Sequence, residues 1–399
     1  MKEFDFTVLK GDKRSRARRG VIKTRCGCID TPYFVPVATM ASVRALGSDD
    51  LADLNVQCIL ANAYYLHLKP GDELIKKLGG LHKFMAFDRP IFSDSAGFQA
   101  FSLGFGREHN ISKIGNIFPE GREAGERKEN LTKITDEGIY FKSARDGTRR
   151  FMDAKTSMKI QSNIGSDIIM AFDECTSPLS DYEYTKRAME RTHDWANLSL
   201  QYQDKQQAIY GIIQGGWFED LRHESTEFIT SLPFDGIAIG GSLGNSKSDM
   251  HQVLEWVIPQ LDERPRHLLG IGEIEDVFEC VERGIDTFDC VAPTRLARRG
   301  NVFISPESGG GLENKFRITI KAGKYKDDKK PIDIRCTCPT CQQYSRAYLR
   351  HLYTSYELAY FRLASVHNLH FMLTLMEQIR TSIANGTFSR LKQKWLEKN

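Results

Sequence analysis

Four side chains suited to chemistry on a heterocycle stand at equivalent places in the sequence. Each lies where a short apolar run breaks into small or polar residues, and they are Asp94, Asp173, Gln214 and Asp289. Carboxylates and carboxamides can pair with the donor and acceptor edges of a base, and the backbone amides of the turn at Gly240 and Gly241 can bond its carbonyl group. Two carboxylates that face one glycosidic carbon can also perform a double displacement, one as the nucleophile and the other as the acid/base. Because Asp is also common at helix caps and in turns, the prediction of a base-binding pocket depends on the whole set.

Three cysteines within six residues predict a metal site. Cys336, Cys338 and Cys341 supply three thiolates, and a tetrahedral zinc ion would need one further ligand. The downstream histidines that could provide it are His351, His367 and His370. Nothing in the pattern implies an open coordination position, so we predict one structural Zn²⁺. The alternative, three buried thiols, is disfavoured because packing alone does not require this spacing.

A local excess of positive charge follows the last of the four polar side chains. It consists of the segment 315–330 and of three arginines close to Asp289, namely Arg295, Arg298 and Arg299. The net charge of the whole chain is only +3, so the excess is local. Such a cluster could grip a phosphate backbone, although a solvated face is the alternative. Near Asp94, the ring of Phe98 could stack on a planar ligand or belong to the core.

Eight short apolar runs are spaced along the chain so that they would bring these side chains to one end of a sheet. The runs cover residues 33–39, 58–66, 90–97, 167–174, 208–216, 236–244, 267–273 and 287–293. Runs without polar alternation are typical of parallel strands buried on both faces, and most gaps contain helix-like stretches, such as 181–203. We therefore predict an α/β fold, a (β/α)8 TIM barrel, over an open doubly wound sheet. In either fold, residues just after the carboxyl end of a strand are the site candidates.

Two segments interrupt this alternation and indicate the domain organisation. Residues from about 105 to 130 are polar and charged, which indicates a surface insertion. It is either a lid or a disordered loop. After about residue 311, the basic segment leads into the cysteines and then into a helix-like, aromatic-rich tail. We expect a barrel domain of residues 1–310 and 375–399, with a zinc-binding subdomain at 311–374.

The composition limits the class of protein. Of the 399 residues, 41% are hydrophobic and 27% are charged, which excludes disordered and fibrous proteins. No apolar run is long enough to cross a membrane, and the first residues do not resemble a signal peptide. The cysteines number nine, an odd count that indicates reduced thiols rather than a disulfide framework. We expect a cytoplasmic protein that does not bind membranes.

The motifs around these residues resemble one known family. They are SDSAGFQAFSL, DIIMAFDECT, GIIQGG, GIAIGGSLG, RGIDTFDCVAPTR and CTCPTCQQYSRAYLRHL with a later VHNL. In this order, and over nearly the whole chain, they are similar to the bacterial-type tRNA-guanine transglycosylases. The resemblance implies a TIM barrel with a zinc-bearing subdomain inserted near its end, and a homodimer. It also implies exchange of the guanine at the wobble position of a tRNA with a GUN anticodon for a 7-deazaguanine base, in queuosine modification.

The resemblance further implies a role for each candidate residue. Asp289 matches the nucleophile that attacks C1′ of the ribose and leaves a covalent tRNA-enzyme intermediate, and Asp94 matches the general acid/base. Asp173 and Gln214 match residues that recognise the base edge. The remaining matches are backbone contacts to the base at Gly240, Gly241 and Ser242, a ring sandwich by Phe98 and Leu269, and the zinc ligands Cys336, Cys338, Cys341 and His367.

The chain departs from the family pattern in four places, one of which is the insertion at about 105–130, which has no counterpart in that pattern. Ala96 stands where the family has glycine, beside Asp94, and NAYYL replaces NTFHL at residues 62–66. The turn after the sixth strand, GGSLGNSK, is one residue shorter than the usual bacterial one, and one alignment puts Gly244 where a valine limits the base pocket. Cys175 still matches the bacterial pattern. We expect 7-aminomethyl-7-deazaguanine as the incoming base, with queuine as its rival.

Two other functions compete with this one. A non-catalytic RNA-binding partner subunit of a transglycosylase would be free to lose the catalytic aspartates, whereas this chain keeps Asp94 and Asp289. A relative that acts on DNA is the other hypothesis, and neither the zinc module nor the CVAPTR segment supports it.

Overall fold

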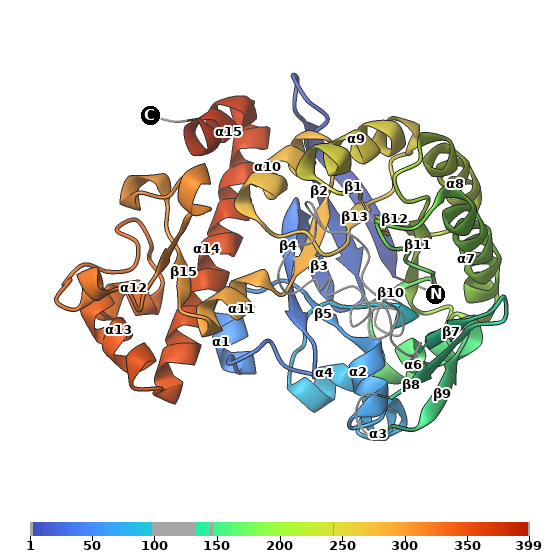
Figure 1. Cartoon of the computed structure of the whole chain (residues 1–399), viewed down its shortest axis with the longest axis horizontal. Coiled ribbons are helices and arrows are strands. Elements are labelled where there is room, and N and C mark those ends of the chain that lie inside the picture. Colours follow the sequence, from blue (N-terminus) through green and yellow to red (C-terminus); the bar gives the residue numbers. More distant parts are fainter. Residues whose placement is uncertain (1–2, 98–131, 144–146, 242, 398–399) are drawn as a thin grey trace. The chain divides into compact units, whose positions relative to one another are not determined.

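The computed structural model describes residues 3–97, 132–143, 147–241 and 243–397 (Figure 1). Eight short strands form a closed barrel, with parallel pairing between neighbours such as β10 and β11. In order around the barrel they are β4 (Tyr33–Ala38), β5 (Ile59–Ala61), β6 (Ile91–Ser93), β10 (Ile168–Met170), β11 (Ala208–Ile213), β12 (Gly236–Ile239), β13 (Arg266–Leu268) and β14 (Thr287–Cys290). The predicted TIM barrel is confirmed, and the open doubly wound sheet is wrong. The predictions for Phe98, Ser242 and the insertion at about 105–130 lie outside the described residues.

The barrel strands form where continuous apolar runs predict them. Every residue of β6, β10, β11 and β12 is buried, as expected for strands that are covered on both faces. The strand β13 begins at Arg266, one residue before the predicted run. This arginine is tolerated in a buried position because its Nη2 donates to the carbonyl oxygens of Asp262 (3.0 Å) and Leu261 (3.5 Å).

Some of the helices that follow the strands begin at side-chain caps. Asp181 accepts a hydrogen bond from Tyr184 N at the start of α7 (Tyr182–Tyr202), and Ser246 forms a reciprocal capping box with Asp249 at the start of α9 (Lys247–Val257). The other helices of this part of the chain are α1 (Ser48–Asp53), α2 (Ala63–Leu68), α3 (Asp72–Lys77), α4 (Gly80–Met85), α6 (Ala154–Ile164), α8 (Glu219–Ser231), α10 (Ile274–Glu282) and α11 (Ala292–Arg298).

The chain divides into two compact units. The first comprises residues 1–6, 22–28 and 60–269, and the second comprises 7–21, 29–59 and 270–399. The first unit contains an antiparallel sheet that the sequence did not predict, made of β7 (Thr132–Ile134), β8 (Ile139–Lys142) and β9 (Arg149–Met152). A further three-stranded sheet near the N-terminus consists of β1 (Phe4–Gly11), β2 (Arg18–Thr24) and β3 (Gly27–Thr31).

The second unit ends in a module that shares its core with the segment after β14. The module contains the antiparallel pair β15 (Asn301–Phe303) and β16 (Arg317–Thr319), followed by α12 (Pro339–Gln343), α13 (Arg346–Thr354), α14 (Leu358–Ala384) and α15 (Phe388–Leu396). In one buried cluster, Ala297 of α11 lies with Cys338 and Leu349. The predicted domain bounds, 1–310, 311–374 and 375–399, stay a prediction. Among the described helices, none is both long and apolar enough to cross a membrane.

Candidate active site and metal centre

Asp94 directly follows β6 and is held by nitrogen donors. Its carboxylate accepts hydrogen bonds from Asn62 Nδ2 (2.5 Å), Ala63 N (2.9 Å) and Ala96 N (3.3 Å). Asn62 is itself fixed, because its Oδ1 caps α2 by accepting from Tyr65 N at 2.9 Å. Asp94 is therefore an oriented, half-buried carboxylate.

The residue that departs from the family pattern beside Asp94 is strained. Ala96 is fully buried and has a φ of 66°, in the left-handed region. An L-residue other than glycine pays about 1–2 kcal/mol for this conformation. The loop after β6 thus keeps the backbone turn that glycine would provide, at some cost in stability.

Asp173 and Gln214 form a buried pair at the ends of neighbouring strands. Asp173 Oδ1 accepts from Ser95 Oγ at 2.7 Å, and Asp173 Oδ2 accepts from Gln214 Nε2 at 2.8 Å. The other end of the amide, Gln214 Oε1, is buried and has no hydrogen-bond partner among the residues that the structure describes. A buried acceptor without a donor costs free energy, so this oxygen is suited to a donor on a ligand.

The glycine turn after β12 lies against this pair. A Cβ atom built on Gly241 would lie 2.2 Å from Gln214 Oε1, and one built on Gly240 would lie 3.2 Å from Gln214 Nε2 and 3.4 Å from Leu269 Cδ1. Only glycine leaves room there, and Gly241 also has a φ of 79°. The first unit therefore brings together Asp173, Gln214, Gly240, Gly241 and Leu269. Asp94 is adjacent in sequence to Ser95, whose hydroxyl group donates to Asp173.

Gly244 lies close to the start of α9. Its φ is 94°, and a Cβ there would lie 2.2 Å from Cβ of Asp249. Asp249, a member of the capping box of α9, also accepts at its Oδ2 from Asn245 N at 2.7 Å. A valine at position 244 would therefore disturb the start of α9, so this substitution cannot serve as a simple refill of the base pocket.

Asp289 lies in the second unit, in the third position of β14. Its Oδ1 accepts a hydrogen bond from Gly270 N at 3.0 Å, and the residue is half-buried. In the strand pairing it lies opposite Val35 of β4. The carboxylate is thus positioned near the carboxyl end of a barrel strand, where the active sites of TIM barrels are built.

The arginines after Asp289 lie in a cluster of like charge. Burial lowers the pKa of Arg298, and the neighbouring guanidinium groups of Arg44, Arg295 and Arg299 lower it further. Burial and Arg299 likewise lower the pKa of Arg295, against the opposite influence of Cys290. Like charges repel, so a cluster of this kind is stabilised by a bound polyanion. Arg44 belongs to an earlier segment of the chain and was not singled out in the sequence.

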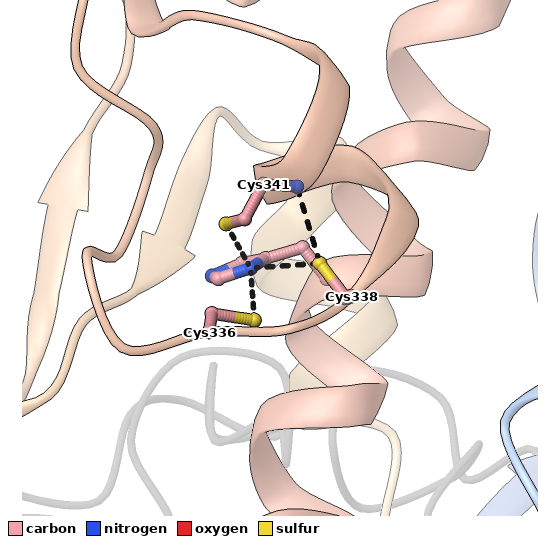
Figure 2. Close-up of side chains that lie close together, drawn as sticks. Cys336, Cys338 and Cys341 are labelled. Carbon is pink, nitrogen blue, oxygen red and sulfur yellow. Dashed lines mark hydrogen bonds between the residues drawn. The ribbon is translucent and has the colours of Figure 1, made fainter.

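Three cysteines and one histidine converge in the module of the second unit (Figure 2). His367 Nδ1 lies 3.6 Å from the Sγ atoms of Cys336 and Cys338 and 3.3 Å from that of Cys341. The other ring nitrogen, His367 Nε2, lies 2.8 Å from the carbonyl oxygen of Phe303, which orients the ring so that Nδ1 faces the sulfur atoms. These four residues could hold a metal ion, and three thiolates with one imidazole are a ligand set of structural zinc sites. Of the three candidate histidines, His367 is the one in this group.

A second group with metal-ligand chemistry is better described as a hydrogen-bond network. The potential ligand atoms of Cys26, His82 and Asp167 lie within 4.8 Å of one another. Asp167, however, already accepts from Arg25 Nε at 2.8 Å and lies 3.0 Å from His82 Nε2. Because the guanidinium group neutralises the carboxylate, a divalent cation would leave excess positive charge in a largely buried place.

Sequence reasoning missed the side chains that hold the candidate site residues. Asn62 directly follows β5 within the apolar run 58–66, and could have been found by the rule that selected Asp94. Ser95 and Arg222 carry no such signal, because their roles depend on hydrogen bonds to distant segments.

Comparison with known proteins gives one consistent result. The family model described as Queuine tRNA-ribosyltransferase matches residues 12–399. A relative from Archaeoglobus fulgidus is 57% identical over 96% of this chain and 96% of its own length. Relatives from Roseiflexus sp. (98% of each chain) and Fusobacterium nucleatum (97% of this chain, 96% of its own) are both 42% identical, and both are named queuine tRNA-ribosyltransferase.

Proposed function

The chain belongs to the queuine tRNA-ribosyltransferase family, and from this premise we propose that it exchanges the wobble guanine of a tRNA with a GUN anticodon for a 7-deazaguanine base. The family assignment confirms the resemblance to the tRNA-guanine transglycosylases and makes the protein a pentosyltransferase. The exchange we propose is a double displacement through a covalent tRNA-enzyme intermediate. A non-catalytic partner subunit is disfavoured because both aspartates of this reaction are present, Asp94 and Asp289.

In the first displacement, a carboxylate oxygen of Asp289 forms a bond to C1′ of the ribose as the bond from C1′ to N9 of guanine breaks. The leaving guanine gains a proton at N9, and the incoming base loses a proton from the equivalent nitrogen. One carboxyl group that alternates between acid and carboxylate can therefore serve both displacements, and we assign that role to Asp94. The three nitrogen donors around Asp94 support this role because they fix the direction of its oxygens.

One observation carries the proposal. The buried Gln214 Oε1 has no hydrogen-bond partner in the described part of the chain. The amide group of Gln214 lies between Asp173 and the turn at Gly241. An arrangement of carboxylate, carboxamide and backbone amide matches the alternating acceptors and donors along a guanine edge. A wobble base in the anticodon stack must turn out before it can reach such a pocket. Leu269, next to Gly240, is suited to cover one face of the ring.

The other groups have supporting roles in this proposal. The arginine cluster of Arg295, Arg298 and Arg299 would bind the tRNA backbone. The cluster of Cys336, Cys338, Cys341 and His367 would hold one structural Zn²⁺, and the protein would act as a homodimer. Between the two candidate bases, 7-aminomethyl-7-deazaguanine is our choice, with queuine as the alternative.

The decisive experiment measures release of labelled guanine from tRNA. A transcript with a GUN anticodon carries radiolabelled guanine at the wobble position and is incubated with the enzyme and each candidate base in parallel. We expect label release with at least one base, and none from a transcript that has another wobble base and carries its labelled guanine elsewhere. Absence of release with both bases would overturn the proposal.

A further inference from the structure

Arg222 of α8 is a fully buried arginine that donates hydrogen bonds to three backbone carbonyl groups. Its Nε donates to Gly216 O at 2.9 Å, and its Nη1 donates to both Ile213 O and Gly240 O at 3.1 Å. A buried guanidinium group is costly to desolvate, so its position calls for an explanation.

These carbonyl groups belong to the strand ends that carry the candidate base-binding residues. Ile213 is the last residue of β11 and precedes Gln214, and Gly240 directly follows β12. Gly240 N also donates to Ile213 O at 3.1 Å, so one arginine nitrogen bridges two neighbouring strand ends that are already bonded to each other.

The same helix holds the other side of the Gln214 backbone. Gln214 N donates to Ser225 Oγ at 3.1 Å, and Ser225 Oγ lies 3.2 Å from His193 Nε2. Burial lowers the pKa of His193 to about 4, so its ring is neutral near pH 7 and can accept the serine proton. The helix α8 is thus a rigid support for Gln214 and for the glycine turn.

The bond to Gly240 O determines where the next N–H group points. In a planar trans peptide, the C=O of one residue and the N–H of the next point in opposite directions. Because Gly240 O points toward Arg222, Gly241 N–H points away from that guanidinium group. Among the described residues, no hydrogen-bond partner is found for Gly241 N.

We infer that Arg222 is a positioning residue of base exchange: it fixes the peptide between Gly240 and Gly241 so that Gly241 N–H donates to the carbonyl oxygen of the base. This inference rests on the proposed function. Although burial lowers the pKa of Arg222 to about 10, the group keeps its charge at neutral pH. A cation bound to the carbonyl end of a peptide polarises it and strengthens the N–H at the other end as a donor.

The test compares guanine with 6-thioguanine, which keeps the ring nitrogens and the amino group but has a weaker acceptor at position 6. In wild-type enzyme we expect guanine to have the lower KM in exchange with tRNA. In Arg222→Met, the KM for guanine should rise about 5- to 10-fold, the loss expected for one hydrogen bond, while the KM for 6-thioguanine rises less and the KM for tRNA stays unchanged.

A matched control is Arg266→Met. Arg266 is another buried arginine that donates to backbone carbonyl groups, but it stands at the first position of β13, the amino end of that strand. Its loss should lower the melting temperature without changing the ratio of the two base KM values. If Arg222→Met fails to fold, Arg222→Lys carries the test, because an ammonium group keeps the charge and can reach fewer carbonyl oxygens.

The outcomes distinguish a failure of this inference from a failure of the proposed base exchange. If the ratio of the KM for guanine to the KM for 6-thioguanine is the same in wild type and in the Arg222 variant, the inference is overturned and base exchange is left intact. Failure of wild-type enzyme to exchange either base would overturn both. If Arg266→Met changes the ratio of the two base KM values as much as the Arg222 variant does, the effect comes from a general loss of stability, and the inference is also overturned.

Discussion

Asp94 and Asp289 are held in ways that suit different tasks. The donors to Asp94 include the side chain of Asn62, which is fixed by its own helix cap, so the carboxyl group has a defined direction for proton transfer. Asp289 lies within a barrel strand and accepts from Gly270 N. Substitutions at the two positions should therefore fail at different steps.

Asp289→Ala should abolish exchange while leaving the fold intact. Removal of a covalent nucleophile lowers turnover by a factor on the order of 10³ or more, whereas loss of the hydrogen bond to Gly270 N costs only about 1 kcal/mol of stability. The measurement is a denaturing gel of enzyme mixed with tRNA and a base analogue. A tRNA-protein adduct that persists in the variant would contradict the assignment.

Asp94→Asn should impair proton transfer more than binding. An amide cannot exchange the proton between leaving and incoming bases, so we expect kcat to fall at least about 100-fold with little change in the KM for tRNA. Asn62→Ala, which removes one of the three donors to Asp94, is the matched comparison and should show a smaller loss. Near-normal turnover in Asp94→Asn would count against its acid/base role.

The candidate residues at strand ends could be predicted from the sequence because one rule applies to all of them. Asp173, Gln214 and Gly241 follow buried strands of the same barrel, and the structure does bring these three together. Ser95 and Arg222 could not be predicted in the same way. Their hydrogen bonds reach residues 78 and 18 positions away, and an arginine within an amphipathic helix has the same pattern as a solvent-exposed charge.

At the scale of elements, strand positions were predictable where burial on both faces produces a continuous apolar run. The sheet of β7, β8 and β9 was missed because only one face of its strands is buried and they follow a long polar segment. In β8, Ile139 and Phe141 are buried whereas Tyr140 is exposed and lies against Phe151, with ring centroids 4.5 Å apart. Such alternation over four residues is too short to distinguish from a loop.

The metal module provides a test at this scale. Cys338 is a metal ligand in our proposal and also caps α12, so Cys338→Ala should lower zinc content and melting temperature together. The measurements are elemental analysis and thermal unfolding. Cys58→Ala, which removes another fully buried thiol, should lower stability without loss of metal.

The identity of the fourth ligand can be tested in the same assay. His370 Nδ1 also lies 3.6 Å from Cys336 Sγ, but it is not in the group of four converging residues. We therefore expect His370→Ala to keep its metal and His367→Ala to lose it. The reverse result would show that the ligand set is different.

At the scale of the whole molecule, the charge balance limits how tRNA can be held. With a net charge of only +3, the protein has little long-range attraction for a polyanion, so local arginines must supply it. Replacing both Arg295 and Arg298 with Ala should weaken tRNA binding and reduce the slope of log K against log salt by about 0.7–0.9 for each lost phosphate contact.

A variant with the same charge change elsewhere separates local contact from net charge. Arg149 and Arg150 are adjacent in β9, and replacing both with Ala also removes two positive charges. The salt slope should change only in the Arg295 and Arg298 variant, while binding of the free base stays the same in both. An equal loss of tRNA and base affinity would show that Arg295 and Arg298 shape the base pocket instead.

The helix α14 connects two of these functions through adjacent residues. His367 belongs to the metal group, and the next residue, Asn368, donates to Pro293 O (2.9 Å) at the start of α11, the helix that carries Arg295 and Arg298. Two ligands that favour the same arrangement of one helix are thermodynamically linked, and linkage is reciprocal. We therefore expect tRNA to strengthen metal binding, measured at equilibrium against a chelator, by the same free energy with which the metal strengthens tRNA binding, so that metal supply and anticodon modification are coupled.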